Sequence, residues 1–445
     1  MSPATLAPGP RGTLLLGNFR DFGRDQLGFY ESCARGHGDL VRVRLGPRRL
    51  LLVFHPDAIE EVLATRSRDY VKSPGVRLLR SLLGDGLLLS EGEIWLRQRR
   101  LVQPAFHRQR LAEYARIMTA ATERRLEGWT DGQVIDVNAE MLGLTQDIVA
   151  RTLFGADVSR ESAAIAQAVQ VLMEDFSSRL HTLRLLPWWV PTPGNLRANR
   201  AIRDLDALVY RIIEGRRRSG EDRGDLLSML LHAQDADDGS GMTDRQVRDE
   251  VMTLFMAGHE TTAVALAWTW LLLGQQPAAE AGLGETLAAA LDGRVPTAED
   301  LPRLAYAEHV VSEAMRLYPP AYALGRQAIR RTAVAGHTLG RGVIVVVPTW
   351  VVHRDPRWFA DPLAFRPERW ADGLARRLPR YAYAPFGGGP RQCVGNAFAM
   401  MEAVLILVTI ARRFRLVLEP DQRVTPVPYV TLRPEPGIRA RLVRR

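Results

Sequence analysis

A glycine-rich loop that contains a cysteine is the segment of this 445-residue sequence best suited to chemistry. Residues 383–399 read YAPFGGGPRQCVGNAFA, and an apolar stretch typical of a helix follows over residues 401–410. The glycines permit close approach of the backbone to a flat ligand. Cys393 lies at or just before the start of the expected helix, where backbone N–H groups and the helix dipole favour a thiolate. Arg391 can add positive charge there or pair with an anionic group of a ligand.

Two plainer interpretations of this loop remain open on the residues alone. A lone cysteine is more often an inert, buried residue than a reactive one. A glycine-rich loop before a helix can also cradle a phosphate. The Gly-Lys-Ser/Thr that completes the usual phosphate motif is missing here, however.

A second candidate site lies in the middle of a long helix. Thr243 and Gln246 form a capping-box pattern, and apolar periodicity then continues to a stop at Pro277. A helix of this length spans roughly 45–50 Å at 1.5 Å per residue. Its centre, 257–262 (AGHETT), is poor helix material, because glycine and threonine weaken helices and polar groups are costly in apolar surroundings. The centre is either a solvated kink or a widened turn that holds a polar pair beside a bound group. A zinc-protease His-Glu-x-x-His motif is excluded, because position 263 is alanine.

A glutamate and an arginine further along form a candidate ion pair. Glu313 and Arg316 lie three residues apart on a helix expected over residues 308–317 and therefore share one face. Alone, such a pair is more often a weak surface contact. If Arg369 joins it, two guanidinium groups around one carboxylate form a network that survives burial. The predicted role of this network is structural.

These motifs together resemble those of the cytochrome P450 family of haem-thiolate monooxygenases. The cysteine loop is similar to the family's haem-binding signature, F-x-x-G-x-R-x-C-x-G over residues 386–395, and residues 257–261 (AGHET) are similar to its oxygen-activating motif. The Glu313 network resembles the family's structural triad, and Trp95 with Arg99 fits its haem-contacting helix. Order and spacing match over nearly the whole chain.

The resemblance implies a haem b cofactor with Cys393 as the axial thiolate ligand of its iron. Phe386 would shield the sulfur, and Gly389 and Gly395 would let the loop lie close beneath the porphyrin. Arginines and a tryptophan would hold the propionates, since a guanidinium matches carboxylate geometry. The expected cofactor-binding residues are Trp95, Arg99, Ala257, Gly258, Arg326, Pro385, Phe386, Gly387, Gly389, Arg391, Cys393, Gly395 and Ala399.

The same resemblance implies that dioxygen is a co-substrate and that Glu260 and Thr261 are catalytic. Gly258 would leave room for dioxygen, Glu260 would shuttle protons through water, and the Thr261 hydroxyl would orient them. The expected reaction inserts one oxygen atom into a C–H or C=C bond. A peroxygenase, an isomerase and a non-catalytic haem-thiolate sensor are the alternatives. The intact acid–threonine pair disfavours all three.

Substrate contacts are placed by the resemblance in residues 71–89, 176–189 and 321–324. These segments are mostly apolar, and they predict a hydrophobic substrate: a terpenoid, fatty acid, steroid or polyketide. Four arginines are interspersed, namely Arg77, Arg80, Arg179 and Arg184. An arginine that captured a carboxylate would favour a fatty acid, and a surface position for these arginines is the equal alternative.

Strands at both ends and helices between them predict a mostly α-helical α+β fold in a single domain, 1–445, with residues 1–20 as an N-terminal extension. The resemblance adds a long central helix that crosses over the haem. Helical spacing dominates from residue 57 to about 290, and a two-domain arrangement stays open on length alone. Strands are expected at 39–45, at 49–54, within 328–347 and as a closing hairpin within 424–442.

Composition narrows the partners and the compartment. Basic residues exceed acidic ones by nine, but they are scattered and no nucleic-acid-binding signature accompanies them, so nucleic acid is not an expected partner. Two cysteines, Cys33 and Cys393, cannot form a disulfide framework, which predicts a reducing cytoplasm. No apolar stretch approaches the roughly 18 residues of a membrane span, and neither a signal peptide nor a membrane anchor is expected.

By the resemblance, electrons come indirectly from NAD(P)H through a ferredoxin or flavodoxin and its reductase, because the chain is expected to carry no flavin or iron–sulfur domain. An acidic carrier is expected to dock on a basic face. The arginines of that face are Arg97, Arg99, Arg100, Arg108 and Arg110. An ordinary solvated face is the alternative, and the expected oligomeric state is a monomer.

Overall fold

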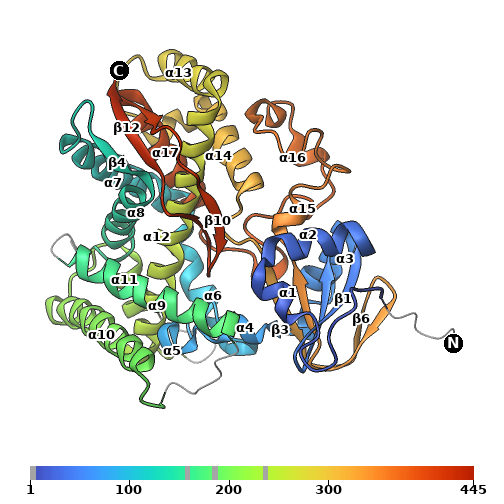
Figure 1. Ribbon diagram of the computed structural model, residues 1–445. Helices are drawn as coiled ribbons and strands as arrows, with labels where there is room; N and C mark the ends of the chain where they lie inside the picture. The colour runs from blue at the N-terminus through green and yellow to red at the C-terminus, as the bar shows by residue number, and fades with distance from the viewer. Residues whose placement is uncertain (1–6, 156–160, 183–188, 234–238) are drawn as a thin grey trace.

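The computed structural model combines a helical part, built around one long central helix, with a smaller part built around a five-stranded sheet (Figure 1). The structure describes residues 7–155, 161–182, 189–233 and 239–445. The α-helices are α1 Phe19–Arg24, α2 Gln26–His37, α3 Pro56–Glu60, α4 Pro74–Arg77, α5 Arg80–Leu83, α6 Gly92–Val102, α7 Arg108–Glu127, α8 Val137–Phe154, α9 Ser162–Thr182, α10 Pro193–Ser219, α11 Leu226–His232, α12 Asp244–Gln275, α13 Pro277–Leu291, α14 Ala305–Leu317, α15 Thr349–Val352, α16 Leu374–Arg377 and α17 Asn396–Arg413. The strands are β1 Leu40–Leu45, β2 Arg48–Val53, β3 Tyr70–Lys72, β4 Val134–Asp136, β5 Leu324–Ala328, β6 Thr332–Val334, β7 His337–Leu339, β8 Ile344–Val347, β9 Phe414–Leu418, β10 Thr425–Pro428, β11 Leu432–Glu435 and β12 Arg439–Arg444.

The largest sheet has the strand order β1-β2-β8-β5-β3, with β2 and β8 parallel. All four residues of β8 are buried, which fits an apolar run covered on both faces. β1 and β2 lie within one residue of the expected strands and turn at Gly46, whose φ of 58° favours glycine. These strand predictions are confirmed.

The expectations for the short strands are only partly confirmed. Within the tract 424–442, β10 and β11 form a hairpin, but β12 leaves it and pairs with β9 and β4. β3 and β4 fall where helical spacing dominates, and each has three residues. Strands this short exist because distant partners pair with them, so local periodicity cannot reveal them.

α12 runs through the helical part for 32 residues, with Thr243 and Gln246 forming the predicted capping box (Figure 1). The helix is α-helical throughout, so the widened turn expected as one alternative at residues 257–262 is not found. The Thr261 hydroxyl donates to the carbonyl oxygen of Ala257 at 2.7 Å within the intact helix. The carbonyl of Ala257 lies four residues before Thr261 in the same helix. It therefore gives the threonine hydroxyl a hydrogen-bond partner without a change of helix type.

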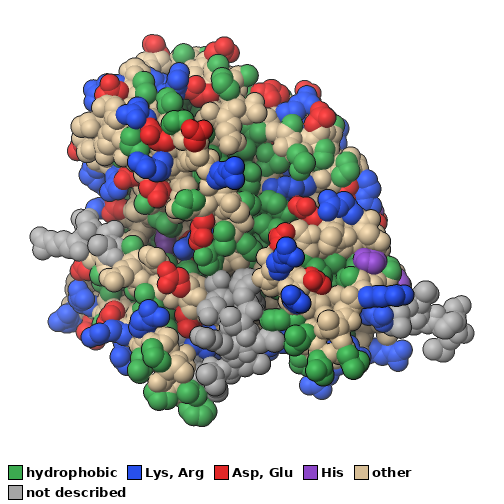
Figure 2. Space-filling model, viewed as in Figure 1, with side chains coloured by type: hydrophobic (Ala, Val, Ile, Leu, Met, Phe, Trp, Pro, Cys, Tyr) green, Lys and Arg blue, Asp and Glu red, His purple; other side chains and the backbone are tan. Residues whose placement is uncertain are grey.

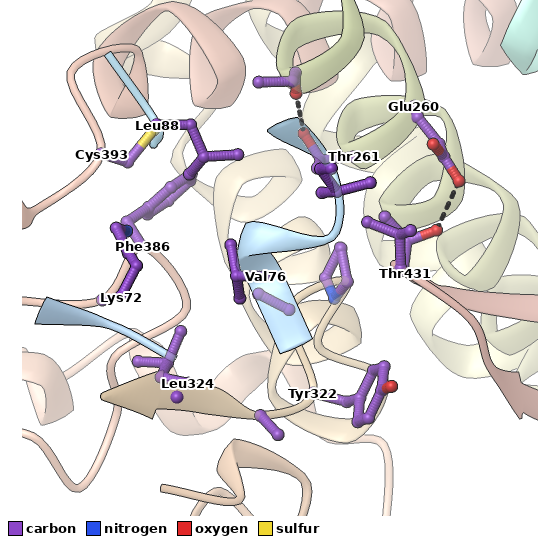
Figure 3. Close-up of a pocket in the computed structure, with 18 of the residues that line it drawn as sticks. Lys72, Val76, Leu88, Glu260, Thr261, Tyr322, Leu324, Phe386, Cys393 and Thr431 are labelled. Atoms are coloured by element: carbon purple, nitrogen blue, oxygen red, sulfur yellow. Dashed lines mark hydrogen bonds between the residues drawn. The ribbon is translucent and has the colours of Figure 1, made fainter. Parts of the chain in front are cut away.

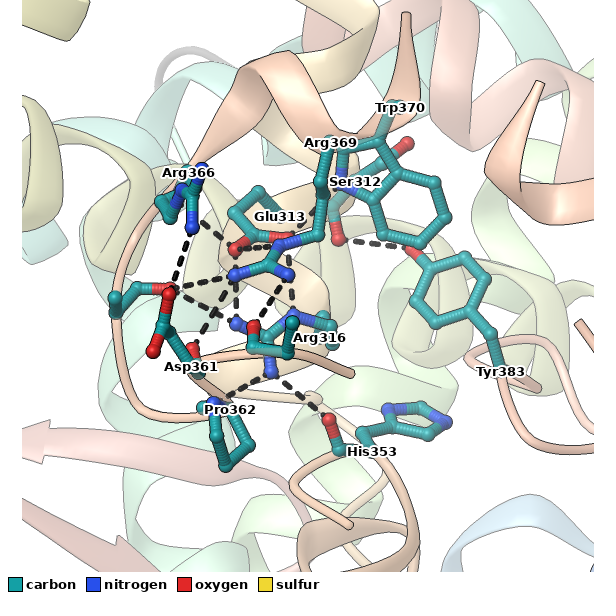
Figure 4. Close-up of polar contacts among 12 residues, drawn as sticks. Ser312, Glu313, Arg316, His353, Asp361, Pro362, Arg366, Arg369, Trp370 and Tyr383 are labelled. Atoms are coloured by element: carbon teal, nitrogen blue, oxygen red, sulfur yellow. Dashed lines mark hydrogen bonds and ion pairs between the residues drawn. The ribbon is translucent and has the colours of Figure 1, made fainter. Parts of the chain in front are cut away.

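The Glu313 network ties α14 to the segment that leads into the cysteine loop (Figure 4). Glu313 accepts two bonds from Arg316, at 2.8 and 2.9 Å, and one from Arg369 at 2.8 Å. The indole of Trp370 and the backbone N–H of Arg366 donate to the same carboxylate, each at 3.0 Å. The side chains of Glu313 and Arg316 are fully buried. The predicted ion-pair network is therefore present and more extensive than expected.

Contacts around this network reach the cysteine loop itself. The Tyr383 hydroxyl donates to the carbonyl of Ser312 on α14 at 2.9 Å, and the N–H of Ala384 donates to the His353 imidazole at 3.0 Å. Arg316 in turn donates to the carbonyl of His353 at 2.9 Å. The chain is thus held in place a few residues before the glycines begin.

We expect Glu313→Gln to destabilise the protein strongly. The amide keeps the shape of the side chain but leaves two buried guanidinium groups without a counter-charge, a loss of about 3–5 kcal/mol in the free energy of unfolding. Urea denaturation measures this loss. Glu308→Gln, on the exposed face of the same helix, is the matched control and should change stability by about 0.5 kcal/mol or less. Equal midpoints for the two variants would contradict the structural role.

Candidate functional site

A cavity of about 570 Å³ lies between the cysteine loop and α12. Figure 3 shows Cys393 and Phe386 on one side of it and Thr261 and Glu260 on the other. All predicted cofactor-binding residues except Gly389 line this cavity, as do Glu260 and Thr261. The volume is typical of sites that enclose a small ligand.

The cysteine loop presents the Cys393 side chain to the cavity. The N–H of Cys393 donates to the carbonyl of Phe386 at 3.0 Å, which closes the loop just before α17 begins. Burial raises the pKa of the Cys393 thiol, while the N–H of Gly395 and the positive charge of Arg99 and Lys72 lower it. The N–H of Gly395 at the helix start thus favours the thiolate as expected, and burial opposes it with the larger effect. A metal ion bound to the sulfur would favour the thiolate form of Cys393, because a thiol that coordinates a metal is deprotonated.

The two glycines singled out by the motif have different roles. Gly389, at φ 64°, packs against a neighbouring backbone: an added Cβ would lie 1.9 Å from the carbonyl oxygen of Leu63. Gly389 therefore lets the loop pack closely on the backbone at Leu63 and does not itself line the cavity. Gly395 does line the cavity, and an added Cβ there would meet nothing closer than the Phe106 ring at 3.5 Å.

Arginines gather at the end of the cavity near Cys393. Arg391 lies over the Trp95 ring at 4.3 Å, donates to the carbonyl of Ser90 at 2.8 Å and pairs with Glu91. Arg99 donates to the carbonyl of Gln392 at 2.8 Å, directly before the cysteine. The sequence motifs named these arginines, and the fold brings them together.

Two further cations at this end of the cavity, Arg326 and Lys72, have lowered pKa values, as expected for cations with too little negative charge nearby. Burial and the charge of Arg391 lower the pKa of Arg326 to about 10. Burial, with Arg326 and Arg391 nearby, holds the pKa of Lys72 well below its usual range. Sequence reasoning missed Lys72, although it is the only lysine in a chain with 59 basic residues. Among the described residues, Glu91 is the carboxylate that acts on the Lys72–Arg326–Arg391 cluster, and net positive charge is left facing the cavity.

The acid and the hydroxyl of α12 are bonded to different partners. Glu260 accepts a hydrogen bond from Thr431 at 2.8 Å and pairs with Arg433 at 2.7 Å (Figure 3). Thr261 donates to the carbonyl of Ala257, as noted above. Both residues lie where the motif predicts, but the partners on β11 and the turn before it were not predicted. Gly258 lines the cavity, and an added Cβ would also press on Val149 of α8 at 3.1 Å.

The expected substrate segments supply much of the remaining wall. From residues 71–89 and 321–324 the lining is mainly aliphatic, and Phe176 of α9 also contributes. Residues 183–188, with Arg184, lie outside the described chain. The lining residues from these segments are Lys72, Ser73, Gly75, Val76, Leu79, Leu82, Leu83, Leu87, Leu88, Phe176, Ala321, Tyr322, Ala323 and Leu324.

Three of the arginines in these segments, Arg77, Arg80 and Arg179, do not line the cavity. Arg80 pairs with Asp85 at 2.6 Å, Arg179 pairs with Asp175 at 2.6 Å, and Arg77 donates to Gln327. Each guanidinium is held by its neighbours in the fold. Of the two alternatives for these three arginines, the contacts favour a structural position over capture of a substrate carboxylate.

The predicted basic docking face is less uniform than the sequence indicates. Arg97 donates to the Ser240 hydroxyl at 2.8 Å, and Arg110 pairs with Glu113 at 3.4 Å. Arg100 is exposed, while nothing is described of the Arg108 side chain. On the face shown in Figure 2, basic and acidic side chains are interspersed.

Comparison with known proteins decides the family. The family model for cytochrome P450 matches residues 7–440. The chain belongs to the cytochrome P450 family. Cyclooctatin synthase of Streptomyces melanosporofaciens is 40% identical over 431 residues, which cover 96% of this chain and 93% of that protein. Pentalenene oxygenase of Streptomyces avermitilis is 36% identical over 453 residues, which cover 100% and 99% of the two chains.

A third relative, cyclooctat-9-en-7-ol 5-monooxygenase of Streptomyces melanosporofaciens, is 39% identical over 434 residues, 97% of this chain and 92% of that protein. This P450 is accordingly a monooxygenase, and its family uses haem b and dioxygen with electrons from NAD(P)H through redox partners. Across the described residues, none of the helices has the length and apolar character needed to cross a bilayer.

The described residues fit haem b. The cofactor carries an iron ion, which suits the Cys393 thiol, and two propionates, which suit the surplus cations around Lys72 and Arg326. The single acidic neighbour, Glu91, is itself paired with Arg391, so a dianionic ligand balances the charge.

The sole lysine offers a direct test of this fit. In the haem-loaded P450, Lys72 should resist an amine-acylating reagent, because a propionate covers its amine; removal of haem by transfer to apomyoglobin should make it reactive. Intact-mass spectrometry counts the added groups, and the N-terminal amine serves as an internal standard in both samples. Lys72→Arg should acquire only the N-terminal group. Rapid acylation of Lys72 with haem in place would contradict the assignment.

Proposed function

We propose that this P450 hydroxylates a terpenoid. The observation that carries the proposal is the wall of the cavity: its substrate side is aliphatic and aromatic, and Arg77, Arg80 and Arg179 are bonded elsewhere. Burial of a hydrocarbon skeleton against such a wall contributes about 25 cal/mol per Å² of apolar surface. The names of the relatives, a pentalenene oxygenase and a cyclooctat-9-en-7-ol monooxygenase, support the same class.

The reaction balances as R–H + O₂ + 2 electrons + 2 H⁺, which yields R–OH + H₂O. Haem b, when bound, supplies the redox chemistry that cleaves dioxygen and oxidises the C–H bond. The chain has to bind the cofactor, exclude water from the hydrocarbon and deliver two protons. Peroxygenases and isomerases do not need this delivery, so the Glu260–Thr261 pair at the cavity supports the monooxygenase.

Residues that line the cavity can perform cofactor binding and proton delivery. Cys393 ligates the iron, and Lys72, Arg326 and Arg391 hold the propionates by charge and hydrogen bonds. Glu260 and Thr261 form the proton relay, with the carboxylate as the proton carrier and the hydroxyl as the orienting group.

A fatty acid is the second candidate, and Arg48 is the reason. This residue begins β2, lines the cavity and carries a positive charge that can pair with a carboxylate. The sequence segments chosen for substrate contacts did not include it.

Optical titrations test both the ligation and the substrate class. Reduced P450 with carbon monoxide should show the red-shifted Soret band of thiolate ligation, and Cys393→Ala should lose it. Among pentalenene, cyclooctat-9-en-7-ol, palmitate, testosterone and a macrolide, the two terpenoids should shift the Soret band at the lowest concentrations. Tightest binding of palmitate, abolished in Arg48→Gln, would establish the second candidate instead.

We also propose a ferredoxin or flavodoxin with its reductase as the electron source. The protein is proposed to act in the cytoplasm, where its two cysteines stay reduced. The exposed Arg100 on α6 supports a docking site for an acidic carrier, because the neighbouring Arg99 contacts the residue before Cys393. Opposite charges steer such encounters, and salt screens them beyond about 8 Å at physiological ionic strength.

Stopped-flow reduction by a ferredoxin measures this docking. The second-order rate constant should fall steeply as salt rises, and Arg100→Gln should lower it at low salt. Arg376→Gln, on α16, is the surface control and should keep the wild-type rate. A rate constant that is independent of salt would contradict electrostatic docking.

A further inference from the structure

The catalytic acid is fastened to the β10–β11 hairpin rather than to the hydroxyl beside it. Three hydrogen bonds converge on Oε1 of Glu260: from the Thr431 hydroxyl at 2.8 Å, and from Nε and Nη2 of Arg433 at 2.9 and 2.7 Å. The Glu260 side chain is 3% exposed, so this carboxylate depends on its partners for charge compensation. Figure 3 shows Glu260 turned toward Thr431 and away from Thr261.

Arg433 connects this buried carboxylate with solvent. Its side chain is 16% exposed, several times more than that of Glu260. Its Nη2 and Nε both reach the carboxylate, and a guanidinium stays charged across the physiological pH range. The guanidinium of Arg433 therefore links the buried carboxylate to the protein surface.

The hairpin that carries both partners also forms part of the cavity wall. Tyr429, Val430 and Thr431, in the turn between β10 and β11, line the cavity. The hairpin is held from both sides: the Trp268 indole of α12 donates to the carbonyl of Leu432 at 2.7 Å, and the Tyr322 hydroxyl donates to the carbonyl of Tyr429 at 2.8 Å. A substrate in contact with this turn touches the element that positions the acid.

We propose that Thr431 and Arg433 are positioning residues of the proton relay: they hold Glu260 as an anion at the cavity wall, where it takes protons from solvent. The inference rests on the proposed function of Glu260 and Thr261. Two protons are needed per turnover, so the acid must be reloaded between them. A carboxylate buried without its guanidinium becomes neutral, and a neutral acid accepts no further proton.

The experiment compares variants of the holoenzyme, with NADPH, a ferredoxin, its reductase and pentalenene as the probe. Product and hydrogen peroxide are measured per NADPH consumed, since uncoupled turnover returns O₂ + 2 electrons + 2 H⁺ as H₂O₂. Arg433→Met should lower product formation by about tenfold, a modest share of what acid–base catalysis contributes, and raise the peroxide fraction. Arg433→Lys should restore most of the coupling, and Thr431→Val should have a smaller effect than Arg433→Met.

Epistasis separates a positioning role from general damage. If Arg433 acts through Glu260, the double variant Glu260→Gln/Arg433→Met should be no more uncoupled than Glu260→Gln alone. Arg441→Met, which breaks an exposed pair with Glu419, is the matched control and should stay coupled. Multiplying effects in the double variant, or wild-type coupling in Arg433→Met, would overturn the proposal.

Infrared spectroscopy provides a readout that needs no turnover. At neutral pH, the difference spectrum between wild type and Glu260→Gln should contain a carboxylate band. In the Arg433→Met background, the same substitution should instead remove the carbonyl band of a protonated acid. A carboxylate band in both backgrounds would overturn the proposal.

Failure of the inference and failure of the relay are distinguishable. Wild-type coupling in both Thr261→Ala and Glu260→Gln refutes the relay itself, and this inference with it. Uncoupling in those two variants together with wild-type coupling in Arg433→Met refutes only the role of the hairpin.

Discussion

Uncompensated charge around one cavity is the constraint on which the rest of this structure depends. Lys72, Arg326 and Arg391 face a cavity that the Cys393 thiol also lines, and among the described residues Glu91 is the carboxylate that offsets their charge. Burial costs each of these groups free energy that neighbouring protein groups only partly offset. A ligand that brings both an iron ion for the sulfur and carboxylates for the cations resolves both imbalances, and haem b is such a ligand.

Buried polar networks next to the site hold the cysteine loop in position. Glu313 accepts bonds from α14 and from residues 366–370, and the surrounding contacts fix the chain at Tyr383 and Ala384. Gly389 then brings the loop against the backbone at Leu63, which only a residue without a Cβ allows. Cys393 is therefore aimed by contacts on two sides, one from the helical core and one from the sheet-rich part.

On the opposite wall, α12 separates two tasks that lie side by side in sequence. Consecutive residues on a helix point about 100° apart, so Thr261 faces the helix carbonyl at Ala257 while Glu260 faces the β10–β11 hairpin. The hairpin thereby joins the substrate wall to the acid. Arg77, Arg80 and Arg179 are held in ion pairs and hydrogen bonds outside the cavity, so their segments contribute mainly apolar side chains to its wall.

The sequence alone identified the cysteine loop, the long capped helix and the Glu313–Arg316 pair, because these depend on residue type and on spacing within one element; the family resemblance, carried by several motifs in order, added Arg369 to the pair. Only the tertiary structure showed that Lys72 joins the cation cluster, that Gly389 serves a backbone contact, and that Arg433 compensates Glu260. Glu260 and Arg433 are 173 residues apart, and neither belongs to a pattern that mentions the other. Pairing across such a distance follows from how helix and hairpin pack, and local periodicity contains no information about that packing.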